Sequence, residues 1–263
     1  MPRMGAAVAT VIGQIIAAIL ALVFNLKCNR ELNISMKGFR PNGHLIVQIY
    51  KVGAPSIVVQ AIGSLMTYGM NLILAAFGSA QTVFGIYFKL QSFVFMPVFG
   101  LNNGMVPIIA YNYGAGHKDR VIKTIKHSVA YGVGIMFVGL LAMHIFPAQL
   151  MRMFDAEESL IAIGAPALET ISLSFVFAGF CIVAGSVFQA LGNGVYSMIV
   201  SVARQMCVLL PVAKLLSLSG EVTLIWWAFP IAELASVLLT SYFLVRIYRK
   251  VICHIGEPVV QDA

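Results

Sequence analysis

The sequence has few charged residues, and this shortage excludes a large class of proteins. Only 10% of the 263 residues are Asp, Glu, Lys or Arg, whereas 60% are hydrophobic and the mean hydropathy is +0.91. A chain this apolar cannot surround one core with a surface that water wets. The composition therefore excludes a soluble globular enzyme.

Cysteine is also scarce, and neither the cysteines nor the histidines form a recognisable motif. The four cysteines are far apart and include no CxxC pair, so the sequence predicts neither a zinc site nor a disulfide framework. The five histidines show neither HxxxH nor HExxH spacing, and no nucleophile with a neighbouring base is recognisable. We therefore predict no catalytic residue and no metal ligand.

What the sequence does have is long apolar runs. Seven stretches are apolar over roughly 20 residues or more, the length that crosses about 30 Å of hydrocarbon as a helix. They lack the alternation of a membrane β-barrel, so each is expected to be helical. We predict an all-α, polytopic membrane protein with about seven transmembrane helices, near 5–26, 53–77, 81–112, 122–146, 161–191, 194–217 and 222–246.

The basic residues predict how the helices are oriented. Lys and Arg outnumber Asp and Glu by 17 to 10, and they lie mostly in the predicted loops, which argues against binding of nucleic acid. Short loops rich in Lys and Arg stay in the cytoplasm. We therefore expect a cytoplasmic-membrane protein with an outside N terminus and a cytoplasmic C terminus, although Arg3 argues against this. The cations that decide it are Lys27, Arg30, Lys37, Arg40, Lys118, Arg120, Lys123, Lys126, Arg249 and Lys250.

Four segments carry a resemblance to a known family. The run FGIYFKLQSFVFMPVFGLNNGMVPIIAYNYGAGHKDRV (84–121) resembles the start of the second half of the multidrug and toxic compound extrusion (MATE) transporters. YKVGAPSIVVQAIGSL (50–65) resembles their seventh helix, FQALGNG (188–194) the turn between the tenth and eleventh, and GAAVATVIGQ (5–14) the sixth. The most specific positions are Gln91, Pro97, Gly100, Pro107, Asn112, Gly114 and Gly116.

The resemblance implies a protein with two six-helix lobes that exchanges a cationic or amphipathic compound for Na⁺ or H⁺, without any other cofactor. This chain would be truncated at its N terminus. Residues 1–45 would hold the last helix of the first lobe and a cytoplasmic inter-lobe loop, 46–248 the six-helix C-terminal lobe, and 249–263 a cytoplasmic tail. Its partners would be the bilayer and the missing first lobe or a second copy. A family carboxylate in the seventh helix corresponds to Gly63 and cannot be carried over.

Ionisable side chains within the predicted helices are the first candidates for a transport pathway, because they are costly in a bilayer. Counting the helical rise places Glu233 roughly 17 Å from one end of its helix and Arg204 roughly 15 Å from the opposite end of its own. We expect the two to face each other near the midplane, either as a structural ion pair or as a transport site. The other candidates, Lys89, Glu169 and Lys214, are nearer the outer surface.

Polar residues and prolines complete the candidates. Gln91, Asn102 and Asn103 in the third predicted helix are candidate pathway residues, although hydrogen bonding between helices explains the asparagines equally well. Prolines kink helices and free carbonyl groups, which transporters use at binding sites and hinges. The candidate hinges are Pro55, Pro97, Pro107 and Pro230.

Two alternatives to a drug antiporter remain open at this point. Related flippases move lipid-linked sugars and need a cationic cavity for a pyrophosphate, to which Lys89, Arg204 and Lys214 could contribute. The second alternative is a truncated chain that packs with other membrane helices and transports nothing, since a transporter needs both lobes around its site.

Overall fold

The computed structural model describes residues 2–28 and 42–256, which form helices and turns with no strand among them. Within these ranges six helices are long and apolar enough to cross a membrane, and one bent pair makes a seventh when it is counted as a single span. The predicted all-α fold with about seven spans is therefore confirmed. The described residues fall into two units that divide between Gln48 and Ile49. The predicted lobe boundary at residue 45 stays a prediction.

The first unit contains helix α1 (Pro2–Cys28), whose stretch Val8–Lys27 is a candidate span. Ile12, Ile16 and Ile19 are each more than half exposed within the structure. A helix that is apolar on all sides is suited to lipid or to other membrane helices. The basic residues Arg30, Lys37 and Arg40, on which the predicted orientation depends, lie outside the described residues.

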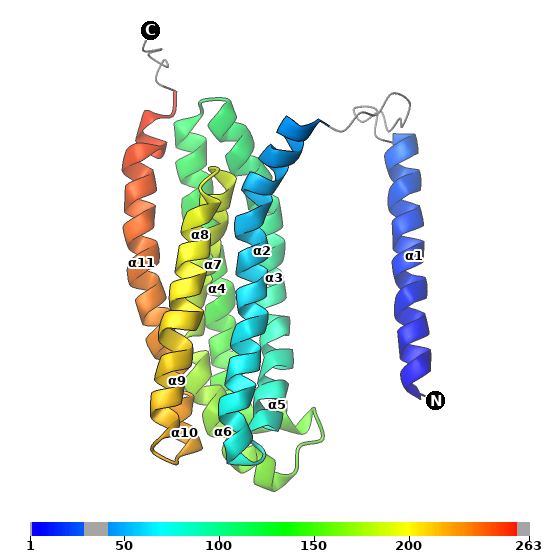
Figure 1. Cartoon of the computed structure of the whole chain (residues 1–263), viewed down its shortest axis with the longest axis vertical. Helices are drawn as coiled ribbons and strands as arrows, with labels where there is room; N and C mark the ends of the chain where they lie inside the picture. Colours follow the sequence, from blue (N-terminus) through cyan, green and yellow to red (C-terminus); the bar gives the residue numbers. More distant parts are fainter. Residues whose placement is uncertain (1, 29–41, 257–263) are drawn as a thin grey trace. The chain divides into compact units, whose positions relative to one another are not determined.

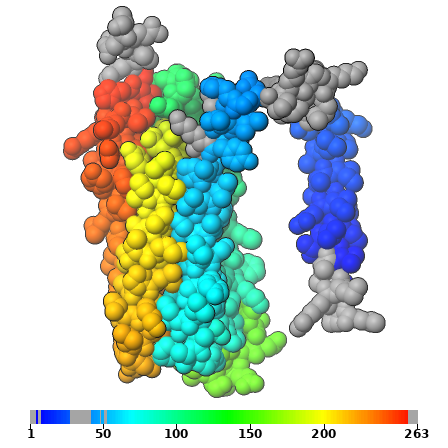
Figure 2. Space-filling model, viewed as in Figure 1, coloured from blue at the N-terminus to red at the C-terminus, as the bar shows by residue number. Residues whose placement is uncertain are grey.

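The second unit is a bundle of long helices (Figure 1). Figure 2 shows α2 beside α8 and α9 along one face. Gly69 of α2 allows the close approach to Leu210 of α9, because a Cβ at Gly69 would lie only 2.8 Å from a methyl carbon of that leucine. The spans are α2 (Gly43–Leu74), α3 (Ala80–Gly114), α4 (Lys118–Ile145), α6 (Glu158–Ser172) with α7 (Phe175–Ala190), α8 (Gly194–Val202) with η2 (Ala203–Leu209) and α9 (Leu210–Ser217), and α10 (Val222–Ile225) with α11 (Ala228–Lys250). Short helices η1 (Ala75–Phe77), α5 (Pro147–Arg152) and η3 (Ile252–His254) lie between or after them.

The predicted single helix over 161–191 is broken into α6 and α7, which meet at an angle of 49°. The break lies at Leu173 and Ser174, whereas Pro166 lies within α6. The Ser174 hydroxyl donates to the Ile171 carbonyl at 2.6 Å, and the Ser172 hydroxyl donates to the Glu169 carbonyl at 2.9 Å. Serine hydroxyls that bond carbonyls of the preceding turn compete with the backbone ladder and bend helices, which explains the position of the break.

The prolines are placed differently from one another. Pro97 and Pro107 lie inside α3, which continues through both, and Pro55 lies inside α2 in the same way. Pro230 instead lies in the first turn of α11, where a missing N–H costs no helical bond. Pro230 therefore does not kink the interior of a helix. The span is interrupted just before it, between the end of α10 at Ile225 and the start of α11 at Ala228. The hinge role of the prolines stays a prediction.

Helices α4 and α7 pack closely through glycines. A Cβ on Gly179 would lie 3.0 Å from the Gly132 carbonyl oxygen and 2.9 Å from Cγ of Met136. Small residues allow two membrane helices to approach at backbone distance. This contact fixes α7, and α7 in turn forms one wall of the cavity described below.

Replacing Gly179 with valine should therefore destabilise the bundle by about 1 to 3 kcal/mol, because the backbones must separate to admit the side chain. The matched control is Gly134→Val on α4, where a Cβ meets nothing within 4 Å. The apparent melting temperature in detergent measures both. If the two variants melt at the same temperature, the packing at Gly179 has been misassigned.

Candidate functional site

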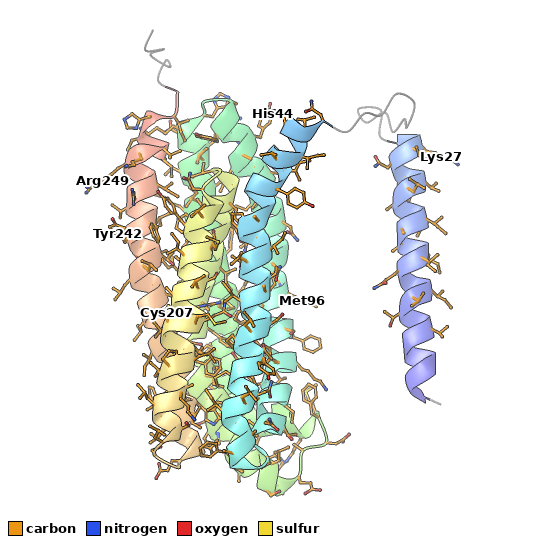
Figure 3. The ribbon with its side chains drawn as sticks, in the orientation of Figure 1. Lys27, His44, Met96, Cys207, Tyr242 and Arg249 are labelled. Carbon is orange, nitrogen blue, oxygen red and sulfur yellow. The ribbon has the colours of Figure 1, made fainter. Side chains whose placement is uncertain are left out.

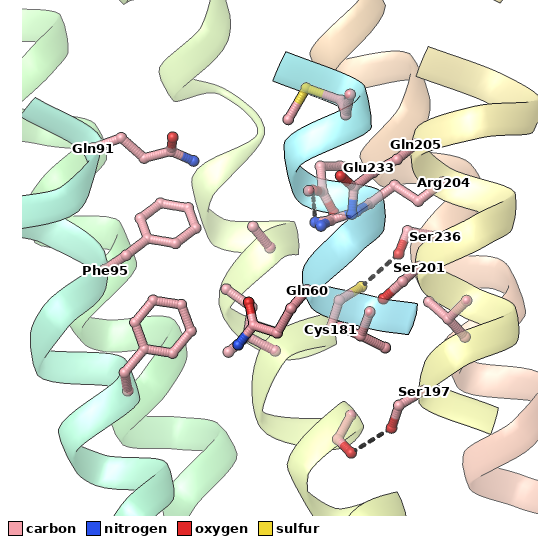
Figure 4. Close-up of a pocket in the computed structure, with 18 of the residues that line it drawn as sticks. Gln60, Gln91, Phe95, Cys181, Ser197, Ser201, Arg204, Gln205, Glu233 and Ser236 are labelled. Atoms are coloured by element: carbon pink, nitrogen blue, oxygen red, sulfur yellow. Dashed lines mark hydrogen bonds and ion pairs between the residues drawn. The ribbon is translucent and has the colours of Figure 1, made fainter. Parts of the chain in front are cut away.

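A cavity of about 750 Å³ opens between α2, α3, α7, the α8–η2 segment and α11 (Figure 4). Its volume is within the usual range for sites that hold small organic ligands. Its apolar lining includes aromatic side chains from α3, α7 and α11. Its polar lining includes Gln60, Ser64, Gln91, Asn102, Asn103, Ser197, Ser201, Arg204, Gln205, Glu233, Ser236 and Thr240.

Arg204 and Glu233 form an ion pair in the wall of this cavity. Nη1 of Arg204, on η2, donates to Oε1 of Glu233, on α11, at 2.6 Å. The Glu233 side chain is 10% exposed and that of Arg204 is 25% exposed. The prediction that they face each other is confirmed. The pair therefore links η2 to α11 across the cavity wall.

Arg204 projects from a π-helix, η2, which links α8 to α9. Pro211 follows this segment and has no N–H with which to bond the Cys207 carbonyl in the α-helical pattern. A π-helical turn widens the helix locally, and such turns are frequent at functional sites. This local geometry was not predicted from the sequence, in which Pro211 was the only signal.

Several buried acceptor oxygens around the cavity receive no hydrogen bond from residues 2–28 or 42–256. Oε2 of Glu233, Oε1 of Gln205 and Oδ1 of Asn102 are all buried without a hydrogen-bond partner among the described residues. All three side chains line the cavity. Buried polar atoms are normally satisfied, so a cluster of acceptors in one cavity indicates that the missing donor comes from a ligand, an ion or water.

Other side chains close to the ion pair are already satisfied. Sγ of Cys181 on α7 accepts from the Ser236 hydroxyl at 3.4 Å and from the Thr240 hydroxyl at 3.7 Å, both on α11. The Ser197 hydroxyl donates to the Gly185 carbonyl at 2.6 Å and so ties α8 to α7. These contacts hold the helices on either side of the ion pair. Cys181 was not a candidate, because a single cysteine in an apolar run carries no distinctive signal.

The candidates on α3 are divided between the cavity and other surfaces. The three polar candidates Gln91, Asn102 and Asn103 all line the cavity. Met96, on the same helix, instead lies on the outer side of α3 (Figure 3) and is 67% exposed. The missing N–H of Pro107 leaves the Asn103 carbonyl without its helical donor, which adds an acceptor beside the cavity.

The remaining charged candidates are not brought to the cavity. Lys89 is exposed, and its Nζ lies 5.6 Å from the centre of the Phe154 ring. Glu169 is half-buried on α6, and Lys214 is exposed on α9; neither lines the cavity. Gly63, where the family resemblance implied a carboxylate, does line it.

Comparison with known proteins agrees with this architecture. A sequence model for the family described as MatE matches residues 55–215. The chain belongs to the MATE family. The multidrug export protein MepA of Staphylococcus aureus (strain bovine RF122 / ET3-1) is 27% identical over 231 residues, 87% of this chain and 51% of MepA. MepA of Staphylococcus haemolyticus (strain JCSC1435) is 26% identical over 247 residues, 94% of this chain and 54% of that protein.

Solved structures show the same fold. The MATE multidrug transporter DinF-BH is 33% identical with a TM-score of 0.81, over 94% of this chain and 56% of that one. A MOP superfamily transporter from Pyrococcus furiosus matches in fold at 19% identity with a TM-score of 0.84, over 97% of this chain and 57% of that one. The chain spans about half the length of the curated relatives it matches. It is a multi-pass membrane protein of a transporter family.

Proposed function

We propose that this chain forms the C-terminal half of an antiporter that exports cationic or amphipathic drugs across the cytoplasmic membrane in exchange for Na⁺ or H⁺. The observation that carries the proposal is the Arg204–Glu233 pair in the cavity wall, beside buried acceptor oxygens on Glu233, Gln205 and Asn102 for which the described part of the chain supplies no donor. Such a set is suited to a cation or to the donor groups of a drug.

The exchange follows from competition for one carboxylate. Oε1 of Glu233 accepts a hydrogen bond from Arg204, whereas Oε2 has no partner among the described residues and can bind a second positive group. A proton that neutralises Glu233, or a sodium ion beside it, reduces the attraction for a cationic drug. A coupling ion can drive drug release only if the protein binds the drug less tightly when the ion is bound than when it is not. Because the ion and the drug would compete for Glu233, binding of the ion weakens binding of the drug.

The rest of the cavity is suited to flat, apolar drug rings. Phe88, Phe95 and Phe99 of α3 and Phe229 of α11 line it. Aromatic faces attract cations as well as apolar rings, with a gain of about 0.5 to 2 kcal/mol for each well-placed cation. Unlike a fixed set of hydrogen bonds, such a wall accepts ligands of different shape, as multidrug export requires.

The cavity does not favour a lipid-linked sugar. Among the described residues that line it, Arg204 is the single Lys or Arg, and Glu233 neutralises its charge. Lys89 and Lys214, which could have contributed to a pyrophosphate site, do not line the cavity. A net-neutral pair offers no counter-charge to a pyrophosphate. The sugar flippase is therefore the less favoured of the transport alternatives.

We place the basic end of the bundle in the cytoplasm. Lys118 donates to the Cys253 carbonyl at 2.8 Å, so the α3–α4 turn and the end of α11 lie at the same end. A reporter fused after Lys118 or at the C terminus should report cytoplasm, and one inserted near Glu157 should report the exterior, because basic loops stay inside. Exchange of the readouts at two of these sites would refute the orientation.

The half-transporter proposal predicts that the chain alone exports nothing. One wall of the central pathway belongs to the other lobe, so cells making only this chain should retain ethidium as control cells do. Co-expression with a matching first lobe should give efflux that an uncoupler stops. Uncoupler-sensitive efflux by the chain alone would overturn the proposal that a first lobe is required, and the mass of the detergent-purified particle would then show whether two copies had replaced it.

A further inference from the structure

A second hollow, separate from the central cavity, lies between α3 and α4. This groove has a volume of about 660 Å³ and runs along the two helices toward their common turn. On α3 its lining includes Gly100, Gly104 and Asn112, and on α4 it includes Arg120, Lys123 and His127. None of these six residues lines the central cavity, so the proposed transport function leaves the groove unexplained.

The floor of the groove is open because two glycines form it. A Cβ placed on Gly100 or on Gly104 would meet nothing within 4 Å. Gly100, Gly104 and Asn112 share one face of α3, since they are four and eight residues apart. The twelve helical steps from Gly100 to Asn112 span about 18 Å, close to the roughly 15 Å of hydrocarbon in one leaflet. The groove thus has the length of one lipid chain.

One end of this apolar channel is positively charged. Arg120, Lys123 and His127 recur on one face of α4, and all three are exposed. Within the described ranges, neither Arg120 nor Lys123 has a carboxylate at ion-pair distance. Nδ1 of His127 lies 2.7 Å from the Lys123 carbonyl, where it donates, so that the ring holds its other nitrogen, Nε2, away from the helix.

The asparagine at the same end has unused hydrogen-bonding capacity. Asn112 is 8% exposed, and its Nδ2 donates to the Ile108 carbonyl at 2.8 Å. Its Oδ1 is buried without a partner among the described residues. Because Asn112 lines the groove, a ligand hydroxyl there is a suitable donor for this oxygen. A ligand that supplies both an anion and a hydroxyl therefore satisfies every group at this end.

We infer that the groove between α3 and α4 binds an anionic phospholipid, with its phosphate at Arg120 and Lys123, a headgroup hydroxyl beside Nε2 of His127, and one acyl chain over Gly100 and Gly104. Phosphatidylglycerol has the required chemistry, since its headgroup carries a phosphate and glycerol hydroxyls. Basic pockets between membrane helices hold anionic headgroups in this way. A helix of another protein is the weaker candidate, because a transmembrane helix brings no negative charge to the basic end.

The test is native mass spectrometry of the purified chain, titrated with phosphatidylglycerol or with phosphatidylcholine of the same acyl length. The parent should bind phosphatidylglycerol at least about tenfold more tightly. Arg120→Gln with Lys123→Gln should remove most of that preference, because each cation near an anionic surface contributes substantially. Gly104→Leu should weaken binding of both lipids, because the leucine side chain would occupy the space in the groove where we place the acyl chain.

Matched controls separate the groove from general effects. Lys126→Gln with Arg249→Gln removes two exposed cations that do not line the groove, and Gly85→Leu adds a side chain on α3 where a Cβ meets nothing within 4 Å. Both controls should bind like the parent. A lipid-free melting curve for each variant identifies any that has simply lost its fold.

Three results would overturn the inference. Equal affinity of the parent for the two lipids would mean that no headgroup is recognised. Equal losses in the groove variants and their controls would mean a diffuse surface attraction. Displacement of phosphatidylglycerol by millimolar glycerol phosphate, with Gly104→Leu unchanged, would mean that the site takes a soluble phosphate without using the channel.

Discussion

Arg204→Ala should lower the apparent melting temperature of the chain in detergent by roughly 5 to 10 °C, the largest loss that we expect from a single cavity residue. Removing one partner of a buried ion pair leaves the other charge buried and unpaired, which lowers the free energy of unfolding by about 3 to 5 kcal/mol. We expect a loss near the lower end of this range, because both side chains border a cavity and are not fully enclosed. The stranded group is the Glu233 carboxylate, which is only 10% exposed.

The double replacement Arg204→Met with Glu233→Leu should recover much of the loss, because apolar side chains of similar volume substitute well for a buried pair. Lys214→Ala is the matched control, since Lys214 is exposed on the same span and lies outside the cavity. If Arg204→Ala melts like Lys214→Ala, the pair contributes nothing to the fold.

The positions of the spans and of the ion pair could be predicted from the sequence because each depends on a simple physical rule. Backbone groups in lipid must bond within their own helix, so long apolar runs give helices. Because the helical rise is fixed, counting residues predicts that Arg204 and Glu233 lie at the same depth. In the structure their side chains are in contact, with 2.6 Å between Nη1 and Oε1. The same counting placed Lys89, Glu169 and Lys214 near the ends, and the structure keeps them out of the cavity.

Local backbone changes could not be predicted in this way. The break between α6 and α7 depends on hydroxyl groups of Ser172 and Ser174 that bond nearby carbonyls, which hydropathy does not register. The π-helix that carries Arg204 depends on how the chain accommodates Pro211 among its neighbours. The unpartnered oxygen of Gln205 could be recognised only once five segments had been assembled around one cavity.

Glu233→Gln in a two-lobed protein should reduce the initial rate of ethidium efflux at least about tenfold, to the level of cells without the transporter. A neutral amide neither exchanges a proton nor balances a cationic drug. The fold should tolerate this change better than Arg204→Ala, because the amide oxygen can still accept from Nη1 of Arg204 and the stranded guanidinium is 25% exposed to the cavity. Glu169→Gln is the matched control, a half-buried carboxylate on α6 that does not line the cavity.

The rate of ethidium efflux from energised cells, measured together with the yield of monodisperse protein, is the most direct test of the claim that Glu233 serves transport. If Glu233 serves transport, Glu233→Gln should give background efflux at near-parental yield, whereas Glu169→Gln should match the parent in both. Parental efflux by Glu233→Gln at parental yield would contradict it, and would leave the Arg204–Glu233 pair with a purely structural role.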